Sequence, residues 1–208
     1  MNPPFHILCV TNRGLCPGDF LERLEAIAAA GPDQLNGVIL REKDLSESAY
    51  RALATEAVKI CGRHGVPYVL HTYPRVAREL GAGVHLPLPV LRSLSPGARA
   101  ELKTIGASCH SVQDAVEAQA LGATYITAGH VFATGSKPGL PPRGLDFLRE
   151  VCEAVTLPVY AIGGVNAGNI ADVQAAGALG ACVMGDFMRC PDPVALIAAL
   201  RESLHGFL

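Results

Sequence analysis

The feature of this sequence that most restricts its fold is a regular alternation of short apolar runs with helix-forming segments. The apolar runs are bounded by turn residues and recur at about 25 residues per unit, the order expected of a strand followed by a helix. They are apolar throughout, which is typical of parallel strands covered on both faces. The predicted strands cover residues 6–11, 38–40, 66–70, 83–86, 103–108, 125–129, 158–162 and 180–184. Eight such units predict an α/β fold, a single small (β/α)8 TIM barrel rather than an open sheet.

Helix start signals agree with this order. Asp19, Ser46 and Ser111 stand where a short side-chain oxygen can accept hydrogen bonds from free backbone N–H groups, and Asn166 is a fourth candidate cap. The predicted helices cover residues 20–30, 47–63, 75–80, 112–121, 145–154, 166–176 and 193–204. The least regular segment follows the fourth strand, where prolines recur between residues 87 and 96.

Composition limits the class of protein. The chain has 208 residues, of which 50% are hydrophobic, and a net charge of −2, so we expect one domain covering residues 1–208. The near-balanced charge argues against a nucleic-acid partner, and the absence of a long apolar run or a signal peptide argues against a membrane. The seven scattered cysteines include no C-x-x-C pair. We therefore expect free thiols in a reducing cytoplasm, and no bound metal.

The longest irregular stretch lies in residues 125–144, YITAGHVFATGSKPGLPPRG. It begins as a strand, breaks at His130, and continues as a proline-stiffened loop that carries Thr134, Lys137 and Arg143. A loop of about fifteen residues inside a compact domain is usually functional. Histidine is a natural proton carrier near neutral pH, so we interpret His130 as the catalytic centre and the loop as a lid or anion clamp. The alternative is a hydrogen-bonded, half-buried histidine beside a surface loop.

Further polar residues follow other predicted strands. The carboxyl ends of the strands of a (β/α)8 barrel meet at one rim, where active sites lie. The candidates for that rim are Arg41, Lys43, His71, His85, Ser108, His110, His130, Gly163, Gly164 and Gly185. Each alone has an ordinary explanation: a solvated charge, a hydrogen-bonded core histidine or a tight turn. Their convergence on one rim is what indicates a site.

Two groups of rim residues suggest an anionic ligand. Arg41 and Lys43 are two positions apart, so they would face the same side if the strand geometry continues. After the seventh and eighth strands, glycine would let backbone N–H groups approach a phosphate closely, and a helix N-terminus would favour negative charge there. The predicted phosphate contacts are Gly163, Gly164, Met184 and Gly185, with Lys137 reaching in from the loop.

Several blocks of the sequence resemble a known superfamily. GVILREKDL, IGASCHS, YITAGHVFATGSKPGLPPRGLDFL, VYAIGGVNAGNI and AGALGACVMGDF look like the thiamine phosphate synthase superfamily, and within it like the TenI-type thiazole tautomerases. The resemblance covers nearly the whole chain. It implies the same barrel, a small phosphorylated thiazole carboxylate as ligand, no cofactor, and an isomerase of thiamine biosynthesis that shifts a proton to aromatise the thiazole ring.

The same resemblance suggests roles for individual residues. His130 matches the histidine that carries the proton in such tautomerases, and the glycines after the seventh and eighth strands match those that hold the phosphate. The residues expected around the rest of the substrate are Arg41, Lys43, His71, Ser108, His110, Thr134 and Lys137.

One departure favours the tautomerase over the synthase. The synthases of this superfamily carry Asn-Asp at the end of the third strand and Asp after the fourth, which hold magnesium and pyrophosphate. This chain has His71-Thr72 and then HLPLP at 85–89, without a carboxylate. Mg²⁺ prefers hard oxygen ligands, usually including one or two carboxylates. A typical tautomerase has an amide at position 71, so the histidine there departs from both branches.

Two other functions remain open. One is a transferase, thiamine phosphate synthase itself. The other is a non-catalytic protein that binds a thiazole or thiamine phosphate as a regulator. The sequence leaves the oligomeric state open, with a homodimer among the alternatives.

Overall fold

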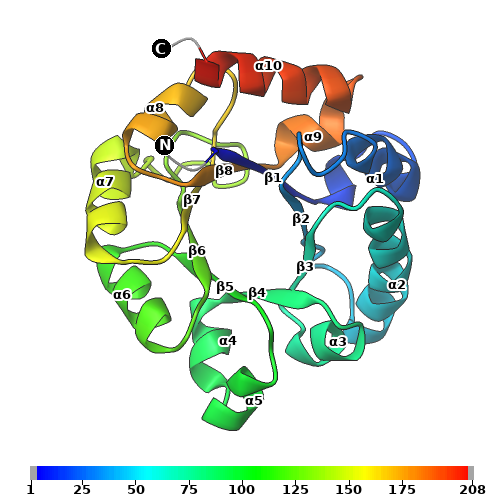
Figure 1. Cartoon of the computed structure of the whole chain (residues 1–208), viewed down its shortest axis with the longest axis horizontal. Coiled ribbons are helices and arrows are strands. Elements are labelled where there is room, and N and C mark those ends of the chain that lie inside the picture. Colours follow the sequence, from blue (N-terminus) through cyan, green and yellow to red (C-terminus); the bar gives the residue numbers. More distant parts are fainter. Residues whose placement is uncertain (1–3, 206–208) are drawn as a thin grey trace.

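The computed structural model describes residues 4–205, in which eight parallel strands close into a barrel in sequential order (Figure 1). The strands are β1 (His6–Val10), β2 (Gly37–Leu40), β3 (Tyr68–His71), β4 (Gly83–Pro87), β5 (Ile105–Cys109), β6 (Tyr125–Gly129), β7 (Val159–Ile162) and β8 (Gly180–Val183). Because β1 pairs in parallel with both β2 and β8, the sheet has no free edge. The predicted (β/α)8 barrel is confirmed.

Helices form a ring around the barrel (Figure 1). They are α1 (Phe20–Ala28), α2 (Glu47–Arg63), α3 (Pro74–Glu79), α4 (Leu88–Ser93), α5 (Pro96–Ala100), α6 (Val112–Ala120), α7 (Gly144–Ala154), α8 (Ile170–Ala175), α9 (Gly185–Arg189) and α10 (Pro193–His205), with a 3-10 turn η1 (Arg13–Leu15) after β1. Within residues 4–205, no helix combines the length and apolarity needed to cross a membrane.

Three of the predicted helix caps are present. The Asp19 carboxylate accepts hydrogen bonds from two backbone N–H groups of α1, and the hydroxyls of Ser46 and Ser111 each accept one from α2 and α6. These side chains satisfy donors that a helix start leaves free. The three helices therefore begin where the sequence predicts.

The predicted cap at Asn166 is wrong. The Asn166 side-chain oxygen accepts a hydrogen bond from Gly168 N at 2.8 Å, and that of Asn169 accepts one from Asn166 N at 2.9 Å. These bonds build a turn, so α8 begins at Ile170. Asparagine side chains compete for nearby backbone groups in this way and delay the helix.

The proline-rich segment after β4 also differs from expectation, because it holds two short helices that the sequence analysis did not predict. Each has proline in its first turn, where the missing N–H removes no helical hydrogen bond. The helix α9, which starts directly after β8, was not predicted either.

The core has two parts. The larger one fills the space between barrel and helices, and a smaller one inside the barrel contains Leu8, Val10, Ile39, Tyr160 and Cys182. The strands are not uniformly apolar, because His71, His85 and Thr127 are also buried. His85 on β4 hydrogen-bonds with polar side chains of β5 and β6, and His71 on β3 packs beside it, so these positions form a polar inner wall of the barrel.

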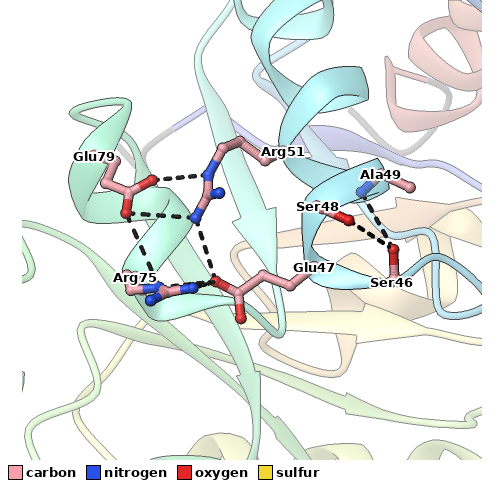
Figure 2. A network of polar contacts seen from close by, with 7 residues as sticks. All are labelled: Ser46, Glu47, Ser48, Ala49, Arg51, Arg75 and Glu79. Atoms are coloured by element: carbon pink, nitrogen blue, oxygen red, sulfur yellow. Dashed lines mark hydrogen bonds and ion pairs between the residues drawn. The ribbon is translucent and has the colours of Figure 1, made fainter.

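Outside the barrel, a charged network joins α2 to α3 (Figure 2). Arg51 and Arg75 contact the carboxylates of Glu47 and Glu79, with an Arg51–Glu79 distance of 2.9 Å and an Arg75–Glu47 distance of 2.8 Å. All four side chains remain at least partly exposed, so solvent screens their attraction. The network lies on the outside of the barrel, where it links the two helices.

Candidate functional site

The carboxyl ends of the strands bring residues from distant parts of the chain to one mouth of the barrel. Nη1 of Arg41, just after β2, lies 4.0 Å from the sulfur of Met184, just after β8. Nδ1 of His110, after β5, lies 2.7 Å from the carbonyl oxygen of Gly129, at the end of β6. The structure therefore gathers these candidates at one end, while their roles stay predictions.

His130 is buried under the loop that follows β6. Its side chain is 6% exposed, and Nε2 lies 3.3 Å from the carbonyl oxygen of Leu140, on the far side of that loop. Its Nδ1 is buried and has no hydrogen-bond partner within residues 4–205. Buried ring nitrogens usually have a partner, so the hydrogen-bonding capacity of Nδ1 is unused in the described chain.

Both ends of the loop are fixed by backbone hydrogen bonds. Val131 N donates to Ile162 O and Phe132 N to Gly163 O, each at 3.0 Å, which extends the pairing with β7 beyond β6. At the other end, Arg143 N donates to the His130 carbonyl, also at 3.0 Å. The Thr134 hydroxyl accepts from Ser136 N at 3.3 Å, so this predicted substrate residue also closes a turn within the loop.

The double glycine after β7 is required by packing. A Cβ at Gly163 would collide with His130, and one at Gly164 would collide with the carbonyl of Ala133. Both glycines also have positive φ, at 98° and 69°. This close approach of the β6 loop explains both glycines without a ligand, and their contact with phosphate stays a prediction.

Gly185 differs, because the three atoms nearest to a Cβ there all belong to the guanidinium of Arg189, the flexible end of a long side chain. Packing therefore does not require glycine at this position. The proposed phosphate contacts of Gly185 and Met184 remain predictions.

Four cations surround the mouth: Arg41, Lys43, Lys137 and Arg143. Burial lowers the pKa of Lys43, and the charges of Arg41 and Lys137 lower it further. Burial likewise lowers the pKa of Lys137, with a further contribution from Arg143. Lys137, from the loop after β6, thus contributes to the electrostatics of Lys43, which follows β2. Within residues 4–205, none of the four forms an ion pair.

Arg41 and Lys43 lie beyond β2, which ends at Leu40, so strand geometry does not place them on the same side as predicted. Arg41 is half-buried and Lys43 is exposed. Burial lowers the pKa of the Arg41 guanidinium, which its neighbour Glu42 opposes. Arg41 is therefore a partly desolvated cation at the mouth, whereas Lys43 lies at the surface beside it.

His71 and His85 form the inner wall on the side of β3 and β4. The His85 ring lies 3.0 Å from the hydroxyl of Tyr125 through Nδ1 and 2.9 Å from that of Ser108 through Nε2. The Nδ1 atom of His71 lies 2.5 Å from the Thr72 hydroxyl. Contrary to expectation, His85 belongs to the barrel interior, and the Ser108 hydroxyl is occupied by it.

These two histidines are neutral at physiological pH. Burial lowers the pKa of His71 to about 2, with contributions from His85, Arg41 and Lys43. Burial alone lowers the pKa of His85 to about 3. His110 is different: it is exposed, its pKa is lowered mainly by partial desolvation, and its hydrogen bond to Gly129 opposes the shift.

Two supporting residues were missed by the sequence analysis. The Tyr50 hydroxyl donates to Leu40 O at 2.6 Å and accepts from His71 N at 2.8 Å, which ties the ends of β2 and β3 together. Glu42 is buried and accepts from the Thr11 hydroxyl at 2.7 Å. Neither residue has a local signal of its role, because Glu42 stands in a run of four charges at 41–44 and Tyr50 lies within a helix. Only tertiary contacts reveal what they support.

The fold and the site define a small (β/α)8 barrel with a cationic mouth at the carboxyl ends of its strands. The family model described as thiamine monophosphate synthase matches residues 7–187, and the chain belongs to this family.

Relatives support this assignment along the whole chain. The chain is 35% identical to a thiamine-phosphate synthase of Shouchella clausii, over 96% of this chain and 98% of that protein. It is 36% identical to a thiamine-phosphate synthase of Thermus thermophilus, over 89% of each. A solved thiamine phosphate pyrophosphorylase from Pyrococcus furiosus superposes with a TM-score of 0.81 at 26% identity, covering 96% of this chain and 95% of that one.

These relatives overturn the expected tautomerase activity and with it the isomerase class. They are named as synthases and a pyrophosphorylase, which are transferases. The physical reason for the error is that the quoted motifs build the barrel mouth and its packing. Gly163 and Gly164, for example, are fixed by the β6 loop whatever reaction takes place above them.

The residues of the mouth do not fit magnesium, which the resemblance to synthases implies. Mg²⁺ usually needs one or two carboxylates, and the inner wall offers neutral imidazoles instead. Within residues 4–205, no group of three or more His, Cys, Asp or Glu side chains is arranged to hold a metal.

Proposed function

We propose that this chain is a thiamine-phosphate synthase, a transferase that makes thiamine phosphate and releases pyrophosphate. The observation that carries the proposal is the similarity to synthases over almost the full length of both chains. Thiamine phosphate contains a pyrimidine joined through a methylene group to a thiazole nitrogen. Its synthesis breaks the bond from that methylene to pyrophosphate and forms the bond to nitrogen, and the pyrophosphate leaves as an anion.

The mouth has groups suited to both anionic substrates. We propose that Arg41, Lys43 and Lys137 bind the pyrophosphate, because charge-assisted hydrogen bonds to phosphate are among the strongest that side chains make. On the other side, backbone groups of Gly163, Gly164, Met184 and Gly185 would hold the phosphate of the thiazole.

The remaining predicted substrate residues would line the space between the two anions. These are His71, Ser108, His110 and Thr134. We propose His130 as the catalytic residue, since an imidazole beneath the loop can donate a hydrogen bond or a proton to the leaving group. The proton transfer expected of His130 in a tautomerase does not apply, because that activity is contradicted by the relatives.

One observation favours a second function, the binding of thiamine phosphate without turnover. The inner wall consists of His71 and His85, which are neutral and unsuited to Mg²⁺. A chain that retains the cationic mouth but has lost the catalytic ion would bind the phosphorylated product and report on its concentration.

A single preparation tests both functions. Purified protein is incubated with the pyrimidine pyrophosphate and the thiazole phosphate, and both thiamine phosphate and released pyrophosphate are quantified. Calorimetric binding of thiamine phosphate is measured in parallel. Equal amounts of the two products at catalytic turnover support the synthase. Binding without turnover supports the second function, and neither binding nor turnover contradicts both.

A matched pair of lysine variants locates the site. Lys43→Met removes a mouth cation, whereas Lys59→Met removes a lysine that pairs with Glu56 on the surface of α2. Only Lys43→Met should raise KM or the dissociation constant. We also propose a cytoplasmic location, because seven free thiols suit a reducing compartment. Homodimer formation stays a prediction, and a measurement of the protein's molecular mass in solution tests it.

A further inference from the structure

We propose that this chain binds pyrophosphate without a divalent cation, and that the four cations of the mouth, Arg41, Lys43, Lys137 and Arg143, neutralise the anion directly. The inference rests on the proposed function for its choice of anion. It departs from the magnesium-bound pyrophosphate that the resemblance to synthases implies, and it stands on three features of this chain.

The first feature is that the carboxylates next to the mouth are already engaged. Glu42 is buried and accepts hydrogen bonds from the Thr11 hydroxyl and from Arg13 N, the latter at 2.9 Å. Asp44 is paired with Arg13, and Asp114 accepts from His110 N at 2.7 Å. Each of these carboxylates is thus held by a protein partner, and a metal ion at Asp44 would compete with the Arg13 guanidinium.

Asp186, which follows Gly185, is engaged more weakly. Its carboxylate lies 3.9 Å from Arg189. A single carboxylate beside a guanidinium is a poor beginning for a Mg²⁺ site, because the arginine charge repels the ion.

The second feature is the uncharged wall formed by His71 and His85. Burial holds both imidazoles in the neutral form, and their rings stack with centroids 5.6 Å apart. The Nδ1 and Nε2 atoms of His85 are occupied by Tyr125 and Ser108. This side of the mouth therefore supplies neither the negative charge nor the hard oxygen pair that Mg²⁺ prefers.

The third feature is the state of the cations. Arg41 is half-buried, and its Nη1 lies 4.0 Å from the soft sulfur of Met184. In addition to burial, the charges of Arg41 and Lys137 lower the pKa of Lys43, and that of Arg143 lowers the pKa of Lys137. None of the four cations has an ion-pair partner among the described residues. Clustered like charges repel one another, and a multivalent anion placed between them relieves that repulsion. These four cations therefore suit a pyrophosphate whose negative charge is not already neutralised by a metal ion.

Titration calorimetry with inorganic pyrophosphate tests the proposal. The protein is titrated once in EDTA and once in excess Mg²⁺, at the same ionic strength. We expect binding in EDTA and weaker apparent binding with Mg²⁺, because the ion complexes the free anion and cancels part of its charge. Tighter binding in Mg²⁺, or binding seen only with Mg²⁺, overturns the proposal. Repeating the titration with Zn²⁺ covers a softer ion, and an increase in affinity there overturns it as well.

Matched variants assign the binding to the mouth. Arg41→Gln should weaken pyrophosphate binding in EDTA about tenfold or more, whereas Arg149→Gln, on the outer face of α7, should leave it unchanged. Lys43→Met and Lys59→Met form a second pair at exposed positions, where folding is not at risk. Equal affinity in Arg41→Gln, Lys43→Met and the parent protein contradicts the assignment.

The calorimetry separates this inference from the proposed function. Metal-free pyrophosphate binding together with an inactive protein would contradict the synthase and uphold the inference. Turnover that requires Mg²⁺, accompanied by pyrophosphate binding that also requires Mg²⁺, would do the reverse.

Discussion

The imidazole rings of His71 and His85 stack across neighbouring strands, with centroids 5.6 Å apart and ring planes 23° apart. The strand register places the two residues side by side, since His71 of β3 pairs with His85 of β4. The two side chains are 5% and 3% exposed, so each ring desolvates the other. This pair gives the mouth its neutral side, and it has consequences for stability as well as for binding.

The first prediction concerns pH. The unfolded chain protonates both histidines below about pH 6.5, whereas the folded chain keeps pKa values near 2 and 3. The stability that the pair contributes is thus complete above pH 6.5 and is lost as the pH falls below it. Each histidine adds about 1.4 kcal/mol per pH unit to the slope of the unfolding free energy between about pH 4 and 6.

Urea unfolding at a series of pH values checks this, with His71→Gln as the comparison. The pKa values of His6 and His110 are lowered too, so the total slope includes other groups, whereas the difference between parent and variant isolates His71. In the variant, unfolding should take up about one proton fewer, so its unfolding free energy should depend less steeply on pH. Parallel curves would show that His71 is protonated in the fold.

The second prediction concerns Tyr125. Its hydroxyl lies 3.0 Å from Nδ1 of the buried His85, so Tyr125→Phe leaves that nitrogen without its partner. We expect a loss of about 1–3 kcal/mol in the free energy of unfolding, the usual cost of an unsatisfied buried polar group. Tyr68→Phe is the control, because the Tyr68 hydroxyl has no hydrogen-bond partner within the described residues. Similar small losses in both variants would mean that the His85 contact contributes little.

The third prediction concerns His130. Its Nδ1 has no partner and its Nε2 makes only a 3.3 Å contact, so His130→Asn should keep the fold and most of the affinity for thiamine phosphate. If His130 transfers a proton in the reaction, turnover should fall by about 10²–10⁴-fold, the usual contribution of an acid–base group. If the variant keeps near-parental turnover, His130 is not the catalytic residue and His110 becomes the candidate.

The fourth prediction separates the glycines at the mouth. Gly185→Val displaces only the end of the Arg189 side chain, so it should change the melting temperature little while weakening binding of the thiazole phosphate about tenfold or more. Gly163→Val collides with His130 at a positive φ and should destabilise the protein strongly. Equal losses of stability and affinity in Gly185→Val would indicate a purely structural glycine.

The sequence by itself determined the barrel and much of its detail. Alternating apolar runs and helix signals act locally, so Asp19, Ser46 and Ser111 marked three helix starts correctly, and the limits of β6 were predicted to the residue. The gathering of Arg41, His71, His110 and His130 at one mouth also followed, because eight parallel strands in a closed sheet can place their carboxyl ends in only one way.

Only the tertiary structure decided what those residues touch. Burial makes His71 and His85 neutral, the approach of the β6 loop requires Gly163 and Gly164, and Tyr50 joins two strand ends from a helix. None of these contacts has a local signature, because each joins residues that are distant in the chain. Local pattern therefore fixes which elements form, whereas desolvation and charge at the site depend on long-range packing.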